Sequence, residues 1–275
     1  MKAFIPLLFL FAFPVLAASV DPGLSVRVGG FWASVDSSFG ARIPALNRGR
    51  RIDFESDLGL EKSRFSPMLE LSYRFNDNHL LALNALTLHR SAATREVIRG
   101  FEFDWEGQTY RAQSDARVSS RLDIDIYQLF YGYSLWRSED LLLVGTLGMH
   151  VMDIKAQMSG ELSLVSDNLD IANVREAEET LTAPLPDLGL MGYWQITPRW
   201  EAVLSAQYFQ LKVDDYKGRL IDLRAQVNRA ITDRFDIGIA WQYYRLTVDH
   251  ERAASGIDLR FSYQGPTLLF QYRFF

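Results

Sequence analysis

The chain has 275 residues, no cysteine and a formal net charge of −5, and 48% of its residues are hydrophobic. The lack of cysteine excludes disulfides and thiolate metal sites, and the mild acidity argues against nucleic acid, which requires a basic face. No metal site or cofactor is predicted, because the sequence has no His-x-His pair, no His–Glu helix motif and no aspartate-rich calcium loop.

The chain opens with a lysine and an apolar run that is too short to span a bilayer. Val15 and Ala17 suit the −3 and −1 positions of a signal-peptidase site. The run therefore predicts a cleaved signal peptide, residues 1–17, with cleavage after Ala18 as the alternative. Residues 18–275 then form one mature domain. No later run approaches the roughly 20 apolar residues of a membrane helix, so a membrane location requires a closed barrel.

Four short stretches of turn-forming residues join pairs of long alternating runs, and longer polar stretches separate these pairs. Short turns at one end and longer loops at the other are typical of a transmembrane β-barrel, with the short turns in the periplasm. The predicted turns are 76–78, 137–140, 197–199 and 232–234, and the predicted loops are roughly 40–65, 94–116, 156–179, 214–218 and 250–256.

These runs predict an all-β fold, a transmembrane antiparallel β-barrel of ten strands, with eight or twelve as alternatives. An even strand count places both termini in the periplasm. Many runs exceed the ~9–11 residues that cross a bilayer, so we expect the excess to project outward. The predicted strands are 24–39, 66–76, 79–93, 117–137, 140–156, 180–197, 199–213, 218–232, 235–249 and 257–275.

Three of these strands alternate apolar with polar residues. A barrel in lipid turns its apolar residues outward, the reverse of a soluble sandwich. The signal peptide, the strand lengths and the turn asymmetry favour the barrel, so we interpret the apolar residues as lipid-facing. They are Leu69, Leu71, Tyr73 and Phe75 in the second strand, Leu122, Ile124 and Ile126 in the fourth, and Ile221, Leu223, Ala225 and Val227 in the eighth.

Aromatic residues beside the predicted turns fit the interfacial girdles of a membrane barrel. For the periplasmic girdle these are Trp136, Tyr193, Trp194 and Trp200, and for the outer girdle or the strand above it they are Trp241, Tyr243 and Tyr244.

The last strand, 257–275, contains two alternating registers that differ by one residue. The apolar residues are odd-numbered up to Tyr263 and even-numbered from Leu268. Gly265-Pro266 lies between them, so we predict a bulge or break there. The strand ends in two phenylalanines and resembles the closing strand of bacterial outer-membrane β-barrels. That resemblance implies a Gram-negative outer-membrane location and the barrel-assembly machinery as a partner.

Further motifs resemble a group of uncharacterised proteobacterial outer-membrane proteins. They are Asp57-Leu58-Gly59-Leu60, Tyr73-Arg74-Phe75 with His79, Val28-Gly29-Gly30-Phe31, Pro184-Leu185-Pro186, Leu188-Gly189-Leu190 and Tyr272-Arg273-Phe274. The resemblance implies a barrel in the outer membrane and no particular reaction.

Charged residues on the polar phase of the strands predict a charge network in the lumen. Barrels of this size are usually filled by side chains, and buried charges must be paired. We interpret the set as a salt-bridged plug in a protein with a structural or surface-binding role; a narrow passive pore for small polar solutes is the alternative. The set is Arg27, Glu70, Arg74, Arg121, Asp123, Asp125, Asp222 and Arg224.

A rim-sited lipid A-modifying or proteolytic enzyme is a further alternative. Asp249-His250-Glu251 is the densest acid–histidine cluster, with His250 as the candidate base. Adjacent strand residues point to opposite faces, so Asp249 cannot orient His250 within a regular strand. No serine motif or paired-aspartate pattern accompanies the cluster, and we predict no catalytic residues and no enzymatic activity.

Loop arginines are candidates for contact with lipopolysaccharide phosphates, because a guanidinium binds phosphate through paired hydrogen bonds. Acidic neighbours such as Asp53 make a solvated charged loop equally consistent. The predicted partners are outer-membrane lipid and lipopolysaccharide. The candidate contacts are Arg48, Arg50, Arg51 and Arg95.

Overall fold

A computed structural model describes residues 22–43, 48–96, 101–105, 108–112, 116–166, 169–213, 216–251 and 256–274. The predicted signal peptide, residues 1–17, lies outside these ranges. No helix in them is long and apolar enough to cross a membrane. The strands are β1 (Gly23–Ile43), β2 (Arg48–Asp53), β3 (Ser63–Arg74), β4 (His79–Glu96), β5 (Phe101–Trp105), β6 (Gln108–Ala112), β7 (Arg117–Arg137), β8 (Leu141–Ser166), β9 (Leu169–Thr197), β10 (Trp200–Val213), β11 (Tyr216–Ala230), β12 (Phe235–Glu251) and β13 (Gly256–Arg273).

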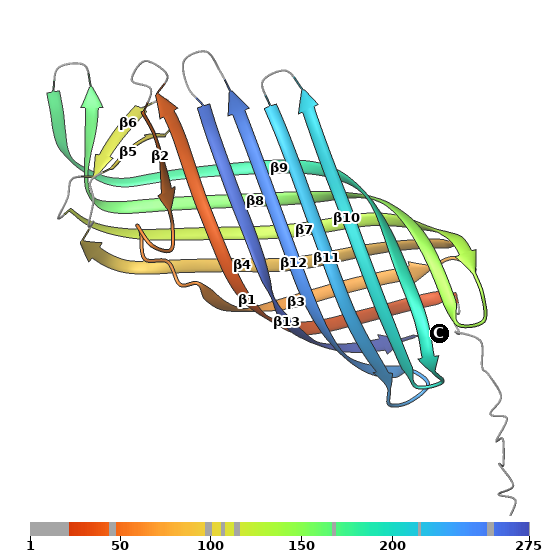
Figure 1. Cartoon of the computed structure of the whole chain (residues 1–275). Coiled ribbons are helices and arrows are strands. Elements are labelled where there is room, and N and C mark those ends of the chain that lie inside the picture. Colours follow the sequence, from red (N-terminus) through yellow and green to blue (C-terminus); the bar gives the residue numbers. More distant parts are fainter. Residues whose placement is uncertain are drawn as a thin grey trace, which may run out of the picture.

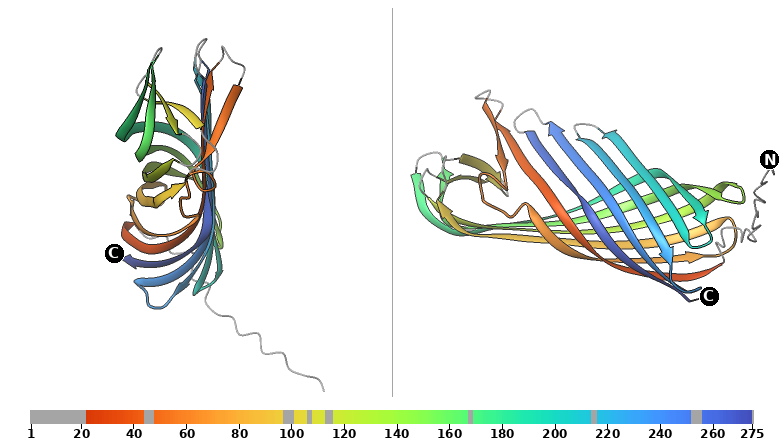
Figure 2. Two further views of the ribbon diagram at one scale, coloured as in Figure 1. Left: turned by 90° about the vertical axis from the view of Figure 1, so that its left-hand side faces the viewer. Right: turned by 60° about the horizontal axis from the view of Figure 1, so that its bottom comes forward.

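Ten strands close into an antiparallel barrel, which confirms the predicted fold (Figure 1). The order around the wall is β1, β3, β4, β7, β8, β9, β10, β11, β12 and β13, and β13 returns to β1. β2 pairs with β1, and the β5–β6 hairpin joins β8. We call the end with the four short hairpins the turn end and the opposite end the loop end. The strands continue far toward the loop end as two diverging groups (Figure 2).

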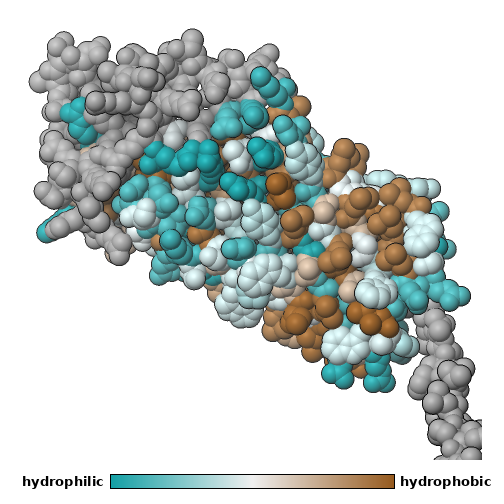
Figure 3. All heavy atoms as spheres, viewed as in Figure 1, coloured by the Kyte–Doolittle hydropathy of each residue, from teal (hydrophilic) through white to brown (hydrophobic). Residues whose placement is uncertain are grey.

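The outer surface changes character along the barrel. Exposed apolar and aromatic residues surround the turn-end half, as Figure 3 shows for one face. Toward the loop end the outward-facing positions become polar. In β1, for example, Val28 and Trp32 are exposed and outward-facing, and beyond them on the same face come Ser34 and Asp36. This boundary marks the upper edge of an apolar band suited to lipid.

The interior changes in the opposite sense, and this corrects one prediction. Leu122, Ile124 and Ile126 of β7 are buried inside the barrel instead of facing lipid. Farther along the same strand, the outward face carries the exposed Tyr127 and Leu129. The strand keeps one side-chain phase throughout. Within the membrane band the apolar residues face outward to lipid and the polar residues face the lumen. Beyond the band the protein has an apolar core, so the apolar residues face inward there. The lipid-facing assignment holds for the second and eighth predicted strands, which lie in the band.

The same inversion explains β13, where the predicted bulge is absent and only a local break in the pairing with β1 occurs. The pairing of β13 with β12 continues unshifted through Trp241–Pro266 and Gln242–Gly265. The pairing with β1 is interrupted at Trp32 and Ala33 but resumes with the same offset. Odd-numbered residues therefore face inward all along the strand: Phe261 and Tyr263 enter the core, and Gln271 and Arg273 enter the polar lumen.

The aromatic residues predicted for the interfacial girdles lie partly on the outer surface and partly inside the barrel. Trp136, Trp194 and Trp200 are exposed on the outer surface beside the turns, and Trp241 is exposed nearer the loop end. Two predicted girdle residues instead face inward. Tyr193 lines the lumen, and Tyr244 is fully buried in the core.

The wall is paired unevenly between β9 and β10. Their pairing runs from the turn end to Leu188–Tyr208, although both strands continue beyond it. The next positions of β9 on that phase are Pro186 and Pro184, which pair with β8 and have no N–H to donate to another strand. The Pro-Leu-Pro stretch therefore accounts for the end of this pairing.

Candidate functional site

The interior of the barrel contains two zones of different chemistry. In the loop-end half, buried apolar side chains from the wall pack into one core, and a segment of the chain folds in among them. In the turn-end half, polar and charged side chains line a cavity of about 330 Å³.

The apolar core crosses the barrel. Its fully buried members come from strands on both sides of the lumen. The Tyr244 and Tyr263 rings stack with centroids 4.8 Å apart, and Phe31 meets Tyr263 edge-on at 5.4 Å. Each large apolar side chain buried in this way contributes about 1.5–3 kcal/mol. The largest fully buried members are Phe31, Leu88, Ile124, Met152, Leu220, Tyr244, Leu246 and Phe261.

The inward segment, residues 54–60, follows β2 and carries the Leu58-Gly59-Leu60 part of the recognised motif. Phe54, Leu58 and Leu60 are buried in the core. Gly59 has φ +74°, a backbone conformation in which glycine avoids the steric cost of a side chain. The segment is also held by backbone bonds, from Phe54 N to the Ser37 carbonyl at 3.0 Å and from Leu60 N to the Phe54 carbonyl at 3.0 Å.

A buried ion pair fixes the inward segment to the wall. Arg90 Nη1 of β4 lies 2.5 Å from Glu55 Oε1, with side-chain exposures of 0% and 1%. Ser37 of β1 donates to Glu55 through its N–H (2.9 Å) and its hydroxyl (2.7 Å), and Arg90 Nη2 donates to the Ser37 hydroxyl (2.8 Å). The carboxylate therefore has partners on both oxygens, as a buried charge requires. The predicted network did not include Glu55 or Arg90.

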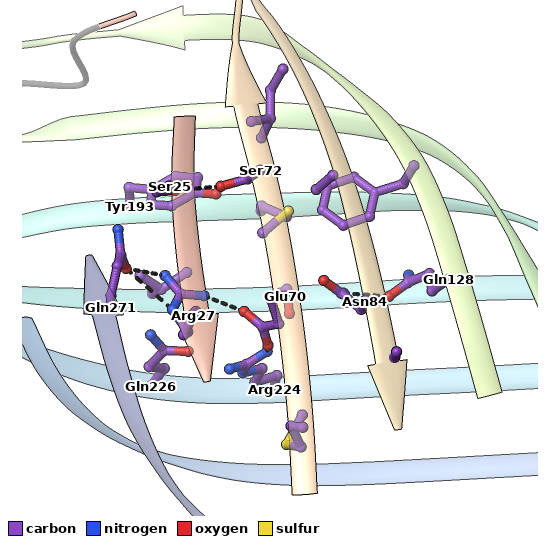
Figure 4. Close-up of a pocket in the computed structure, with 18 of the residues that line it drawn as sticks. Ser25, Arg27, Glu70, Ser72, Asn84, Gln128, Tyr193, Arg224, Gln226 and Gln271 are labelled. Atoms are coloured by element: carbon purple, nitrogen blue, oxygen red, sulfur yellow. Dashed lines mark hydrogen bonds and ion pairs between the residues drawn. The ribbon is translucent and has the colours of Figure 1, made fainter. Parts of the chain in front are cut away.

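The centre of the polar zone is a carboxylate shared by two arginines (Figure 4). Glu70 Oε2 accepts from Arg27 Nη1 at 2.5 Å, and Glu70 Oε1 accepts from Arg224 Nη1. Arg27 also donates to Gln271 Oε1, at 2.5 Å from Nη2 and 3.2 Å from Nε. These residues come from β1, β3, β11 and β13, so the network ties together strands far apart in sequence. It carries one more positive than negative charge.

Amide and hydroxyl groups extend this network around the lumen. Asn84 donates to Gln128 at 2.8 Å, and Gln128 donates to Gln207 at 2.7 Å. Asn228 donates to Glu201 at 2.9 Å, and the Ser25 and Ser72 hydroxyls lie 2.6 Å apart. Such chains satisfy polar groups that would otherwise be buried without partners.

Arg74 differs from the other arginines of the lumen. It is 6% exposed and lines the cavity near the turn end. No carboxylate among the described residues lies within ion-pair distance of its guanidinium, and Asp77 and Glu201 act on its charge only from farther away. Arg224 also keeps two N–H positions, Nε and Nη2, without a partner in the described chain.

His150 lies where the polar zone meets the core. Its Nδ1 is 3.0 Å from Asp187 Oδ2, and its Nε2 is 3.7 Å from Asp222 Oδ2. The Tyr244 ring covers one side, with centroids 5.8 Å apart. The sequence placed His150 and Asp222 in the barrel, but it did not predict that they meet.

The structure brings together five of the eight residues predicted for the lumen: Arg27, Glu70, Arg74, Asp222 and Arg224 all line the cavity. The other three were misplaced. Arg121, Asp123 and Asp125 face outward beyond the apolar band, on the face of β7 opposite Ile124. Arg121 Nε pairs with Asp123 Oδ2 at 2.7 Å, and Asp125 Oδ1 lies 3.0 Å from His89 Nε2.

The predicted loop residues are described only in part. Arg51 of β2 is exposed at the loop end. The backbones of Arg48, Arg50 and Arg95 belong to β2 and β4, and their side chains lie outside the described part, as does that of His250. Among the described residues, no group of three or more His, Asp or Glu side chains is placed to hold a metal ion.

No family model matches the sequence, and no curated protein matches it either. The resemblance to one uncharacterised group therefore stays a prediction. Among solved structures, the outer-membrane protease OmpT of Escherichia coli superposes with a TM-score of 0.58 at 10% identity, over 94% of this chain and 100% of that one. The toluene transporter TodX of Pseudomonas putida (TM-score 0.36, 7% identity, 92% and 90% covered) and Ail of Yersinia pestis (0.30, 11%, 90% and 99%) are more distant. At such identities the likeness concerns the fold alone, and the chain has the fold of an outer-membrane β-barrel protein.

Proposed function

We propose that the protein is an integral protein of the Gram-negative outer membrane whose lumen is closed to ions and solutes, with a structural or surface-binding role. The observation that carries this proposal is the apolar core with the inward segment 54–60. Together they occupy the loop-end half of the lumen, where a pore would need a continuous polar path. The turn end then faces the periplasm with both termini, and the loop end faces outward.

The experiment is conductance of the refolded protein in planar bilayers. We expect no steady conductance, while a known porin inserted in the same bilayers gives discrete steps. Insertion is verified separately by flotation with lipid vesicles and by the mobility shift of unheated samples in gel electrophoresis. Steady ion-selective steps from verified, inserted protein would establish the alternative, a narrow passive pore for small polar solutes.

Lipopolysaccharide is the surface ligand that we propose for the exposed arginines toward the loop end. On β7 the outward positions just beyond the apolar band are Asp125, Asp123 and Arg121, and the exposed Arg121 pairs with Asp123 at 2.7 Å. Arg51 lies farther out, on β2. We expect lipopolysaccharide vesicles to protect the loop end from proteolysis more than phosphatidylcholine vesicles do, and Arg51→Gln to reduce that protection. Equal protection in both vesicles would contradict this contact.

We also propose that the protein has no enzymatic activity. The two described acid–histidine pairs are unfavourably placed for proteolysis or lipid A modification, because His89–Asp125 lies on the outer surface and His150 is buried inside the barrel. Peptide cleavage and lipid A modification should therefore be undetectable. Activity that is lost in His250→Ala would instead identify a rim-sited enzyme.

A further inference from the structure

The arginines of the turn-end cavity are paired unequally with carboxylates. Five arginines line it: Arg27, Arg74, Arg224, Arg234 and Arg273. Glu70 serves both Arg27 and Arg224, and Asp236 serves Arg273 at 2.6 Å.

The remaining lining carboxylates are engaged or lie at the mouth. Glu201 accepts from Asn228, and Asp222 lies beside His150. Asp233 is exposed in the β11–β12 turn. Asp77 of the β3–β4 turn is exposed and lies 3.7 Å from Arg137, so Arg74 has no carboxylate within ion-pair distance among the described residues.

An unpaired buried arginine is costly unless something compensates its charge and its N–H groups. Arg74 is more than nine-tenths buried, yet its guanidinium lines an accessible cavity. Arg74 pairs with Gly23 of β1, and the Ser72–Ser25 hydroxyl pair lies two residues farther along the same two strands. Arg224 adds donors from deeper in the lumen. These groups are all hydrogen-bond donors or can act as donors.

We propose that the cavity binds a small oxyanion, a carboxylate or phosphate compound, with Arg74 as its principal partner. A guanidinium pairs with two oxygens of such a group through two parallel N–H bonds, and this charge-assisted pairing is stronger than a neutral hydrogen bond. The cavity volume, about 330 Å³, suits a compound of a few carbon atoms.

The ligand enters from the turn end. Asp233 and Arg234 of the β11–β12 turn form part of the lining, and Gly23 begins β1 at the same end. The core closes the other end of the cavity, so the site is a blind pocket. The blind shape rests on the closed lumen proposed above, whereas the pairing of Arg74 with an anion does not.

The test is isothermal titration of the folded protein in a neutral detergent at constant ionic strength. Inorganic phosphate and succinate are the two probes, and succinamide is the uncharged control. We expect at least one anion to bind and succinamide not to bind. The probe that binds more tightly distinguishes phosphate from carboxylate ligands.

Arg74→Gln should weaken binding about tenfold or more, because it removes the positive charge and the paired N–H groups that hold the anion. The matched control is Arg199→Gln, which removes an exposed arginine of the β9–β10 turn and should leave binding unchanged. Arg74→Lys keeps the charge, loses the two-pronged geometry and should give an intermediate affinity. Arg74→Lys also tests the site if the Arg74→Gln variant fails to fold.

Absence of binding by both anions, or equal affinities in wild type and the folded Arg74 variants, would overturn the site. Conductance distinguishes this failure from failure of the closed barrel. Channel steps together with Arg74-dependent binding would overturn closure and retain the anion site.

Discussion

Arg90 of β4 and Glu55 of the inward segment form an ion pair of 2.5 Å that is almost wholly excluded from solvent. The pair joins the barrel wall to the segment that completes the apolar core, and Ser37 of β1 binds both partners. It thus connects the closure of the lumen to two strands of the wall.

Glu55→Gln should destabilise the protein strongly, because Arg90 would stay buried without a counter-charge. Breaking a buried pair in this way costs about 3–5 kcal/mol. The measurement is urea unfolding in lipid vesicles, followed by tryptophan fluorescence. The control is Asp123→Asn, which breaks the more exposed Arg121–Asp123 pair and should cost less than about 1 kcal/mol. Equal losses would mean that the Glu55 pair is not buried in the membrane-inserted protein.

The upper edge of the apolar band can be located on one face of one strand. Val28→Arg should cost about 2–4 kcal/mol, as for a cation facing the middle of the bilayer, whereas a cation near or beyond the interface costs roughly 0–1 kcal/mol. Ser34→Arg, six residues along the same outward face of β1, should therefore be nearly neutral. The free energy of unfolding in vesicles of defined thickness measures both. A large cost for Ser34→Arg would move the band toward the loop end.

Glu70→Gln tests whether charges or the apolar core close the lumen. The substitution leaves Arg27 and Arg224 facing each other without their shared carboxylate, so stability should fall. Planar bilayers should nevertheless stay silent, because the core lies beyond the network toward the loop end. Steady current through this variant, with wild type silent, would show that the charge network is the barrier.

Position 265 of β13 requires glycine, both because of its backbone conformation and because Trp32 of β1 lies close to it. Its φ is +155°, and a Cβ built there would lie 2.0 Å from the Trp32 carbonyl oxygen. Gly265→Ala should cost about 1–3 kcal/mol of backbone strain, or block assembly. Gly192→Ala on β9 is the control, since nothing lies within 4 Å of its Cβ position. Folding yield into vesicles compares them, and similar yields would contradict the close approach of β1 and β13.

The sequence alone predicted the barrel, ten strands in its wall and the positions of its four short turns, because strand period and turn residues are local properties. It was wrong to assign 156–179 to a loop, because β8 and β9 continue through most of that range. It also predicted some of the lumen charges within the apolar band, such as Glu70 and Arg224, where the polar phase faces inward, but it missed Glu201, Asp236 and Arg273. The change of apolar phase within the last strand was visible as well, but it was attributed to a bulge or break.

Only the tertiary structure decided at which residues the apolar face of a strand changes from facing lipid to facing the core. Ile124 and Leu223 both alternate with charged residues, yet one is in the core and the other faces lipid. A period of two places alternate residues on opposite faces of a strand, but it does not specify which face points into the barrel. That depends on the height of each residue relative to the membrane band. Contacts between distant strands, such as Glu55 with Arg90 and His150 with Asp187, likewise arise only when the closed barrel brings their strands together.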